Sequence, residues 1–576
     1  MQVAPSRLRP TALYINWASY DELSDAVELT EERALAQLDA LLALRMRGVR
    51  FDGYLMDCFW YARDGGYRAW RKPHWPDGPD RWLDRCHEAG LQPGLWFACN
   101  NLERHCQIDP HPAWEDSLGQ TGLACALFTG GFLGHWLETM SMYYERGFRF
   151  FKLDFVNLNA APREAHARWL PSEIRAMNAQ ALRDGLRRFR AEHPGAYFLA
   201  YNGFEECETD TPNHTAKQTM CGTGADLPKI IDTAWLDVFD SIYCGDPRLA
   251  DVPCRNFWRS KDIYSNHMVR VYEANGIPLS RIDNSGFMIG DTGTCYFRRK
   301  KAWKAMFVLA HARGGWMNTY YGDLSLLDEN DAVWMTRVQD LYLPLQGEGE
   351  WSTFGGVPGR AEPHGFAAAT KDGAVYTVTN PSQGAARIPL PGGGAGDARI
   401  LFHDNGAPPE TAEGVVRLGP EAVAVVGTGR FAADEWDLGT EPDVEIAREE
   451  DPWPLLILRN EDRCLHAETQ PPPPGRDLLI VFQQHRAWGD PVRTTGGWPP
   501  DGLPMDKVIR LSVTQGGKPV ALSRQYDKTI WSGLSWAAVV VRGGDCRTGL
   551  PLKLEAATPE RDAERLDFKV YAFRRD

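Results

Sequence analysis

The chain has 576 residues, of which 43% are hydrophobic and 24% are charged, a composition typical of a folded protein of several domains and not of a disordered or fibrous one. Its formal net charge of −14 argues against a broad nucleic-acid or anionic-membrane surface, because both need clustered Lys and Arg. The chain starts without an apolar segment of signal-peptide length and contains no run of about 18 apolar residues, so we expect a cytoplasmic protein without membrane contact.

Short apolar strands alternate with amphipathic helices from residue 11 to residue 345. After a first strand at 11–17, Leu35, Leu38 and Leu42 fall at helical spacing, and Gly48 stands where a left-handed helix cap belongs. The later strands are expected at 49–57, 91–98, 148–154, 196–202, 236–244, 276–282 and 314–321. Because no glycine-rich phosphate loop follows the first strand, this alternation favours a (β/α)8 TIM barrel over a doubly wound sheet.

The pattern changes after residue 345 to short alternating runs such as 366–380 and 421–429, which are typical of antiparallel strands. An acidic segment at 439–454 then precedes a further β-rich region. We therefore predict a catalytic barrel over residues 1–345, an antiparallel β-sandwich over 346–435 and an additional β-rich domain over 436–576.

The twelve cysteines form no CxxC pair and no regular framework, so most should be buried thiols. Cys99, His105, Cys106 and His111 are the one His/Cys cluster that draws notice, but their spacing matches no zinc pattern. We expect no cofactor and no metal.

Reactive groups of TIM barrels lie at the carboxyl ends of the strands, and in this chain those ends are polar and aromatic. Carboxylates and amides bind sugar hydroxyls, while aromatic faces cover the C–H surface of a sugar ring. The sequence thus predicts an oligosaccharide or glycoside substrate. The candidate residues are Trp17, Asp57, Trp60, Trp96, Lys152, Asp154, Asn202, Glu205, Asp246, Asp283 and Asn318.

Lys152 and Asp154 stand two residues apart and should face the same side of one strand. The pair could merely fill the barrel interior, but an ammonium also keeps a neighbouring carboxylate ionised and nucleophilic. Glycoside cleavage with retention needs a second, protonated carboxyl about 5–5.5 Å away. We choose Asp246 for this role, although it could simply begin an Asp-Pro turn, and Asp240 and Asp251 are its rivals.

Four segments give the chain a resemblance to a known family: 54–61 (YLMDCFWY), 75–97, 151–155 (FKLDF) and 242–247 (IYCGDP). In this order they resemble the α-galactosidase clan of glycoside hydrolases, most closely family 36, across roughly residues 11 to 345. The resemblance implies a retaining hydrolase of terminal α-galactoside-like sugars. It also implies that Asp154 is the nucleophile, Lys152 a sugar ligand and Asp246 the acid/base.

The chain departs from that family at Cys58, where the family often has a second aspartate, and at 201–208, which replaces a sugar-contacting loop. Recognition around the 4- and 6-positions of the sugar should therefore differ from that of galactose. Two other functions are considered, a non-catalytic glycan-binding protein and a metal-dependent lyase that uses Asp154, Glu205 and Asp240. The sequence leaves open whether the protein forms a homo-oligomer.

Overall fold

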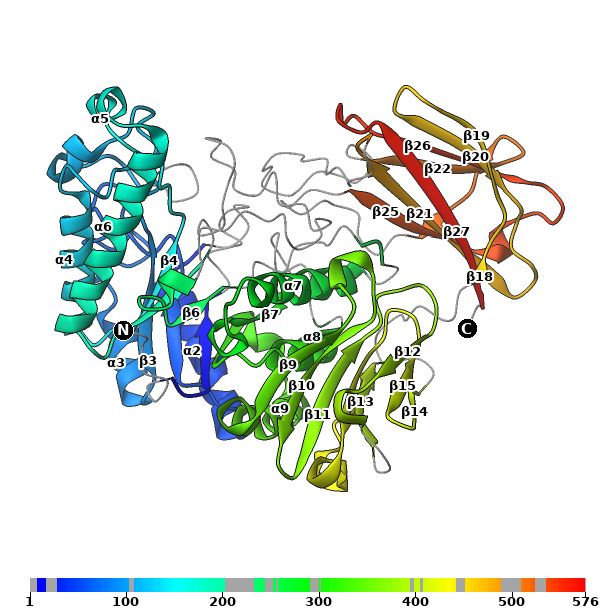
Figure 1. Ribbon diagram of the computed structural model, residues 1–576, viewed down its shortest axis with the longest axis horizontal. Helices are drawn as coiled ribbons and strands as arrows, with labels where there is room; N and C mark the ends of the chain where they lie inside the picture. The colour runs from blue at the N-terminus through cyan, green and yellow to red at the C-terminus, as the bar shows by residue number, and fades with distance from the viewer. Residues whose placement is uncertain are drawn as a thin grey trace.

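The computed structural model describes residues 8–16, 28–102, 108–201, 233–243, 252–254, 257–290, 300, 302–393, 398–404, 408–441, 451–487, 509–523 and 535–574. They form a TIM barrel followed by β-sandwiches, as the sequence predicts (Figure 1). None of the described helices is long and apolar enough to cross a membrane.

The described strands of the barrel form one parallel sheet in the order β6-β5-β4-β3-β2-β1-β8-β7. A bridge between Ile242 and Ile282, together with a 2.7 Å hydrogen bond from Asp283 N to Ile242 O, closes the ring between β6 and β7. The strands are β1 (Thr11–Ile15), β2 (Gly53–Met56), β3 (Gln92–Ala98), β4 (Phe150–Asp154), β5 (Tyr197–Ala200), β6 (Ser241–Ile242), β7 (Asn284–Ile289) and β8 (Met317–Gly322).

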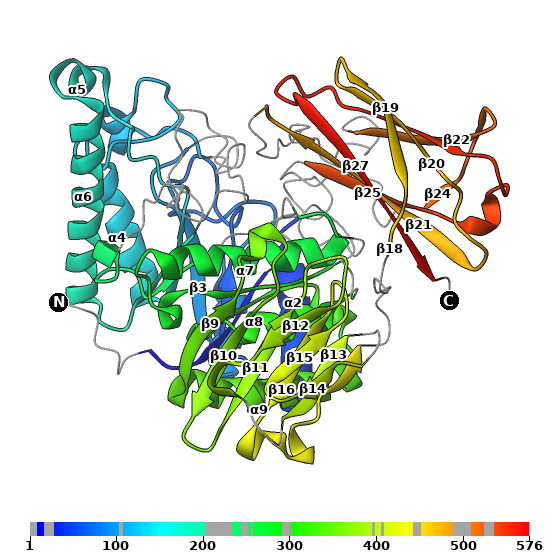
Figure 2. The same ribbon diagram turned by 45° about the vertical axis from the view of Figure 1, so that its right-hand side comes forward.

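Helices cover the outside of the barrel, and α4 and α6 lie side by side in both views (Figures 1 and 2). The first helix, α2, begins where the Thr30 side chain accepts a hydrogen bond from Arg33 N. It ends before Gly48, whose φ of 103° is the left-handed conformation predicted for its cap. The helices are α2 (Glu31–Met46), α3 (Asp80–Glu88), α4 (Phe132–Glu145), α5 (Arg163–Arg168), α6 (Pro171–Glu192), α7 (Phe257–Ala274), α8 (Trp303–His311) and α9 (Glu329–Glu348).

The seventh strand lies later in the chain than predicted. Residues 276–282 were expected to form it, but Leu279–Arg281 is a 3-10 turn and β7 begins only at Asn284. Pro278 explains part of the difference, because proline has no N–H to donate to a neighbouring strand.

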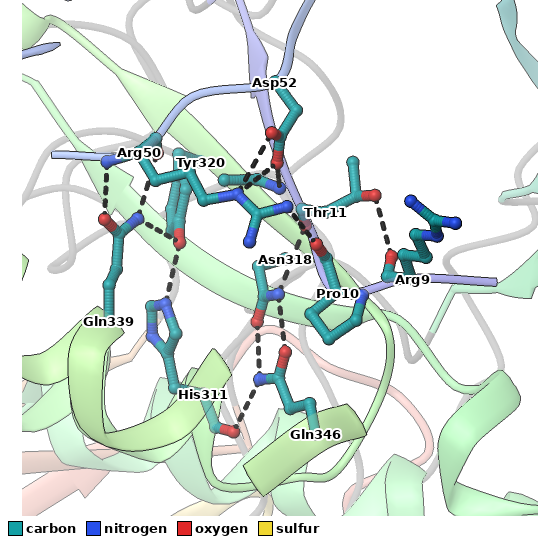
Figure 3. A network of polar contacts seen from close by, with 11 residues as sticks. Arg9, Pro10, Thr11, Arg50, Asp52, His311, Asn318, Tyr320, Gln339 and Gln346 are labelled. Atoms are coloured by element: carbon teal, nitrogen blue, oxygen red, sulfur yellow. Dashed lines mark hydrogen bonds and ion pairs between the residues drawn. The ribbon is translucent and has the colours of Figure 1, made fainter. Parts of the chain in front are cut away.

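The seam between β1 and β8 is fixed by a polar network at the amino ends of the strands (Figure 3). Asn318 donates to Thr11 O at 3.2 Å and to Gln346 Oε1 at 2.8 Å. Since it pairs with Ala12 near the start of β1, Asn318 lies at the opposite end from the carboxyl ends of the strands. Its expected place among the strand-end candidates is therefore wrong, and its role is structural.

The next described sheets are a six-stranded sheet, β17-β13-β16-β11-β10-β9, and a three-stranded sheet, β12-β15-β14. The six-stranded sheet packs on the barrel, because Phe366, Phe402 and Val425 belong to the same hydrophobic cluster as the barrel strands. The strands are β9 (Glu350–Gly355), β10 (His364–Thr370), β11 (Gly373–Thr379), β12 (Ala386–Pro389), β13 (Arg399–Asp404), β14 (Glu410–Ala412), β15 (Val415–Leu418), β16 (Val423–Gly427) and β17 (Gly439–Glu441).

Two five-stranded sheets form the described part of the last region, in the orders β18-β27-β21-β25-β24 and β19-β20-β26-β22-β23. They enclose a hydrophobic core of their own and lie apart from the six-stranded sheet in both views (Figures 1 and 2). The strands are β18 (Asp451–Pro452), β19 (Leu455–Glu461), β20 (Cys464–Thr469), β21 (Arg476–His485), β22 (Arg510–Gln515), β23 (Lys518–Pro519), β24 (Leu522–Ser523), β25 (Trp536–Val541), β26 (Leu552–Ala557) and β27 (Arg565–Arg574). The predicted domain boundaries at 345 and 435 stay predictions.

Arg259 and Glu441 are two of the buried side chains whose polar contacts join the six-stranded sheet to the barrel. Arg259 of α7 is fully buried, forms an ion pair with Asp404 of β13 and donates to Glu421 O at 2.9 Å. Glu441 of β17 accepts from Lys304 N and Ala305 N, both at 2.9 Å, and so caps the amino end of α8.

Two buried histidines should make the fold sensitive to acid. Burial lowers the pKa of His311 and of His364 to about 4. The unfolded chain takes up a proton on each ring near pH 6.5, whereas the folded protein does not, so stability is lost as the pH falls from about 6.5 to about 4. Each histidine contributes up to about 3 kcal/mol to this loss.

We predict that denaturant unfolding, followed at several pH values, shows this loss of stability on acidification. His311→Gln should lower stability at pH 7, because His311 bonds Phe307 O at 2.8 Å and the Tyr320 hydroxyl at 2.7 Å. The same variant should make the dependence on pH shallower. An unchanged pH dependence in this variant would contradict the assignment.

Candidate active site

The carboxyl ends of β2, β3 and β4 bring four predicted residues together. Trp96 pairs with Lys152, and Ala98 pairs with Asp154, in the parallel register of β3 and β4. Asp57 follows β2 directly. Because alternate residues of a strand face the same side, Lys152 and Asp154 both point into the barrel, as expected from their spacing.

Lys152 is the centre of this site. Its ammonium donates to Asp57 Oδ2 at 2.8 Å and to the Tyr321 hydroxyl at 3.2 Å, and it lies 4.2 Å from the centre of the Tyr201 ring. Burial alone lowers the pKa of Lys152. The carboxylates of Asp57 and Asp154 together raise this pKa by more than burial lowers it, so the net shift is upward and the side chain stays charged. The hydrogen-bonded carboxylate is thus Asp57, whereas the sequence suggested Asp154.

Asp154 is held by two donors at the end of β4. Its Oδ2 accepts from Trp96 Nε1 at 3.0 Å, and its Oδ1 accepts from Phe155 N at 2.9 Å. Phe155 has a φ of 45°, a backbone conformation that side chains other than glycine seldom adopt. Both hydrogen bonds favour the negatively charged carboxylate and fix its orientation.

Two of the three tryptophans predicted to bind sugar are described, and their surroundings differ. Trp96 stacks on Tyr61 with 5.8 Å between the ring centres, beside the carboxylate that it orients. Trp60 is fully buried, donates to Trp96 O at 3.0 Å and packs on Trp70. These are contacts of a core side chain, although Trp96 is equally buried, and the role of Trp60 in sugar binding stays a prediction.

Asp240, a rival for the acid/base role and a ligand of the alternative lyase site, lies elsewhere. Its Oδ2 accepts from Arg190 Nη2 at 2.7 Å and from Phe198 N at 2.8 Å. The ring of Phe198 packs on that of Phe189 in α6, so this edge of the sheet faces the helices. Asp240 is therefore committed to the outside of the barrel and is no partner for Asp154.

An aromatic layer that was not predicted lies on the other side of Lys152. Tyr201 and Tyr243 follow β5 and β6 and stack with their ring centres 4.1 Å apart. Asp283 was expected at the carboxyl end of the seventh strand, which is wrong because it directly precedes the amino end of β7; its side chain accepts from the Tyr201 hydroxyl at 2.9 Å. The signal in the sequence was a tyrosine at or just after the end of three apolar strands: Tyr201, Tyr243 and Tyr321.

Several predicted residues lie outside the part of the chain that the structure describes. They are Trp17, Asn202, Glu205, Asp246, Asp251, His105 and Cys106. Among the described residues, no group of three or more His, Cys, Asp or Glu side chains is placed to hold a metal ion.

Comparisons with known proteins identify the fold. No protein-family model matches the chain, and no curated protein matches it. The galactosidase domain of the α-galactosidase–sucrose kinase AgaSK is similar in structure, with a TM-score of 0.50 and 14% identity over 73% of this chain and 55% of that chain. The GH36 α-galactosidase AgaA from Geobacillus stearothermophilus, in complex with stachyose, gives a TM-score of 0.50 and 15% identity over 74% of this chain and 56% of that chain.

The chain thus spans just over half the length of these two solved chains. At such low identity the likeness establishes a shared fold.

We predict that the ammonium of Lys152 is required for stability. Lys152→Met leaves buried carboxylates without a counter-charge and should cost about 3–5 kcal/mol of unfolding free energy. The double variant Asp57→Asn/Lys152→Met should lose less than the two single variants together. Denaturant titration of all three measures the coupling.

The control is Arg63→Met, which breaks an exposed ion pair with Asp109. The Arg63 side chain is 63% exposed and the Asp109 side chain is 48% exposed. This variant should cost less than about 1 kcal/mol. Additive losses in the double variant would show that Lys152 and Asp57 do not stabilise each other.

Proposed function

We propose that the protein is a retaining α-glycoside hydrolase that acts on terminal α-galactoside-like sugars and belongs to family 36. The observation that carries the proposal is the setting of Asp154. Its carboxylate is oriented by Trp96 Nε1 and by Phe155 N, next to the buried pair of Lys152 and Asp57. Such a fixed, charged carboxylate at the end of a barrel strand suits attack on an anomeric carbon.

The proposed reaction is a double displacement. Asp154 attacks the anomeric carbon and forms a covalent glycosyl-enzyme, while Asp246 protonates the leaving oxygen. Asp246 then removes a proton from water, and the water displaces Asp154 to give a sugar of retained configuration. A second sugar in place of water would give transglycosylation. The proposal requires Asp246 to lie about 5–5.5 Å from Asp154.

Sugar recognition is proposed for the residues around this carboxylate. Asp57, Trp60, Trp96 and Lys152 are the described candidates, and Trp17, Asn202 and Glu205 complete the predicted set. Cys58 stands where family 36 often has a second aspartate, so one carboxylate contact to the sugar is replaced by a thiol, which is 9% exposed. We therefore expect weaker discrimination at the 4- and 6-positions.

The structure argues against one of the two alternative functions, the metal-dependent lyase. The lyase would need Asp240 close to Asp154, but Asp240 is bound to Arg190 on the outside of the barrel. A non-catalytic glycan-binding protein remains the alternative of a different class. It predicts sugar binding without turnover, both in the wild type and after loss of the Asp154 carboxylate.

The proposed nucleophile can be tested by chemical rescue. Asp154→Gly should lower kcat on aryl α-glycosides about 10⁴-fold or more, because no covalent intermediate can form. Azide should restore turnover by entering the space of the lost carboxylate, and NMR of the product should show a glycosyl azide of inverted configuration.

Asp184→Asn is the matched control, since this carboxylate lies on the exposed surface of α6 and should leave kcat unchanged. If the wild type hydrolyses no glycoside but binds sugar in calorimetry, the result would favour the glycan-binding protein instead.

A further inference from the structure

A chain of hydrogen bonds crosses the barrel below the proposed nucleophile. Lys152 Nζ donates to the Tyr321 hydroxyl at 3.2 Å, Tyr321 and Tyr201 share a side-chain hydrogen bond, and the Tyr201 hydroxyl donates to Asp283 Oδ2 at 2.9 Å. Thr319 Oγ1 donates to the other oxygen, Asp283 Oδ1, at 3.0 Å. These groups come from β4, β5 and β8 and from the segment before β7, so the chain spans half of the ring.

The direction of this chain is set by its two ends. An ammonium can only donate hydrogen bonds, and an ionised carboxylate can only accept them. With Asp283 ionised, each hydroxyl therefore points from Lys152 towards Asp283. Burial and the charge of Asp283 raise the pKa of Tyr201, which keeps its hydroxyl protonated and able to donate.

The charges in this part of the barrel are unequal. Among the described residues at this level, Asp57, Asp154 and Asp283 surround the single ammonium of Lys152. Arg313, which donates to Asn266 Oδ1 at 3.1 Å, adds a positive charge near Asp283. Burial raises the pKa of Asp283 to about 7, although the hydrogen bonds from Tyr201 and Thr319 and the charges of Lys152 and Arg313 act to lower it.

We propose that Asp283 is a positioning residue. Its protonation changes the hydrogen bond between Lys152 and the Tyr321 hydroxyl, and so the position of the Lys152 ammonium. This inference rests on the proposed function, in which Lys152 binds the sugar beside Asp154. Asp283 itself touches no substrate and acts through Tyr201 and Tyr321.

Protonation of Asp283 reverses the chain. A neutral carboxylic acid has an O–H to donate, and the reversal follows when the proton is on Oδ2, the oxygen that contacts Tyr201, so that Tyr201 receives this hydrogen bond. The Tyr201 O–H must then turn towards Tyr321, where it competes with Lys152 for the Tyr321 oxygen. Lys152 loses part of its support while its bond to Asp57 remains, so its position relative to the sugar changes.

The predicted kinetic consequence is an acidic limb. In the wild type, kcat should fall about fivefold as the pH drops through the midpoint of Asp283, which lies near 7. Asp283→Asn keeps an acceptor for Tyr201 and cannot change its protonation in this range, so its pH profile should lack this limb and stay at the level of the ionised form. Tyr201→Phe interrupts the chain and should abolish the limb as well.

A second measurement needs no substrate. Infrared titration of the free protein should show a carboxylic acid C=O band that disappears with a midpoint near pH 7 and is absent in Asp283→Asn. In Tyr201→Phe the band should persist with a higher midpoint, because the ionised form has lost a donor. If no glycoside is turned over, the proposed function fails, but this titration still decides the state of Asp283.

Glu441→Gln is the control for both measurements. Burial also raises the pKa of Glu441 to about 7, so it gives a second band, but its carboxylate bonds the amino end of α8. Its removal should delete that band and leave the acidic limb of kcat in place. An acidic limb that persists in Asp283→Asn, or an Asp283 band that does not titrate between pH 6 and 8, would overturn the inference.

Discussion

The buried ammonium of Lys152 is the constraint on which the site depends. An unpaired charge in the barrel interior would be strongly unfavourable, so Lys152 needs neighbours that compensate its charge. Asp57 supplies the direct ion pair, and the Tyr201 ring presents its negative face to the same ammonium. The same charge makes a second carboxylate, Asp154, tolerable two residues further along the strand.

This arrangement needs a rigid frame, and the six-stranded sheet is part of it. One hydrophobic cluster runs from the barrel strands into Phe366, Phe402 and Val425 of that sheet. Arg259 and Glu441 then tie α7 and α8 to it by buried polar contacts. The last pair of sheets has its own core, which includes Ala302 at the start of α8. The contacts of Glu441 and Ala302 both lie at the amino end of α8.

The sequence predicted the barrel because local signals agree with the fold. Gly48 adopts the left-handed conformation expected at the end of α2, and the spacing of Lys152 and Asp154 directs both side chains inward. Contacts between distant strands could not be predicted in this way. The choice of Asp57 as the partner of Lys152 depends on the register of β2, β3 and β4, and the placement of Asp240 on the outer face depends on Arg190 of α6. The packing of Trp60 could not be predicted for the same reason, since its aromatic neighbours come from the stretch after β2, from β3 and from α4.

The cap on α8 links the order of synthesis to the completion of the barrel. Glu441 is 137 residues beyond Lys304, from whose N–H it accepts a hydrogen bond. It ends β17, which is the last strand of the six-stranded sheet in the chain. A nascent chain that has only emerged as far as β8 still has the amino end of α8 without this acceptor. The last quarter of the barrel can become fully stable only when β17 has left the ribosome and docked, which makes this contact a late step of folding.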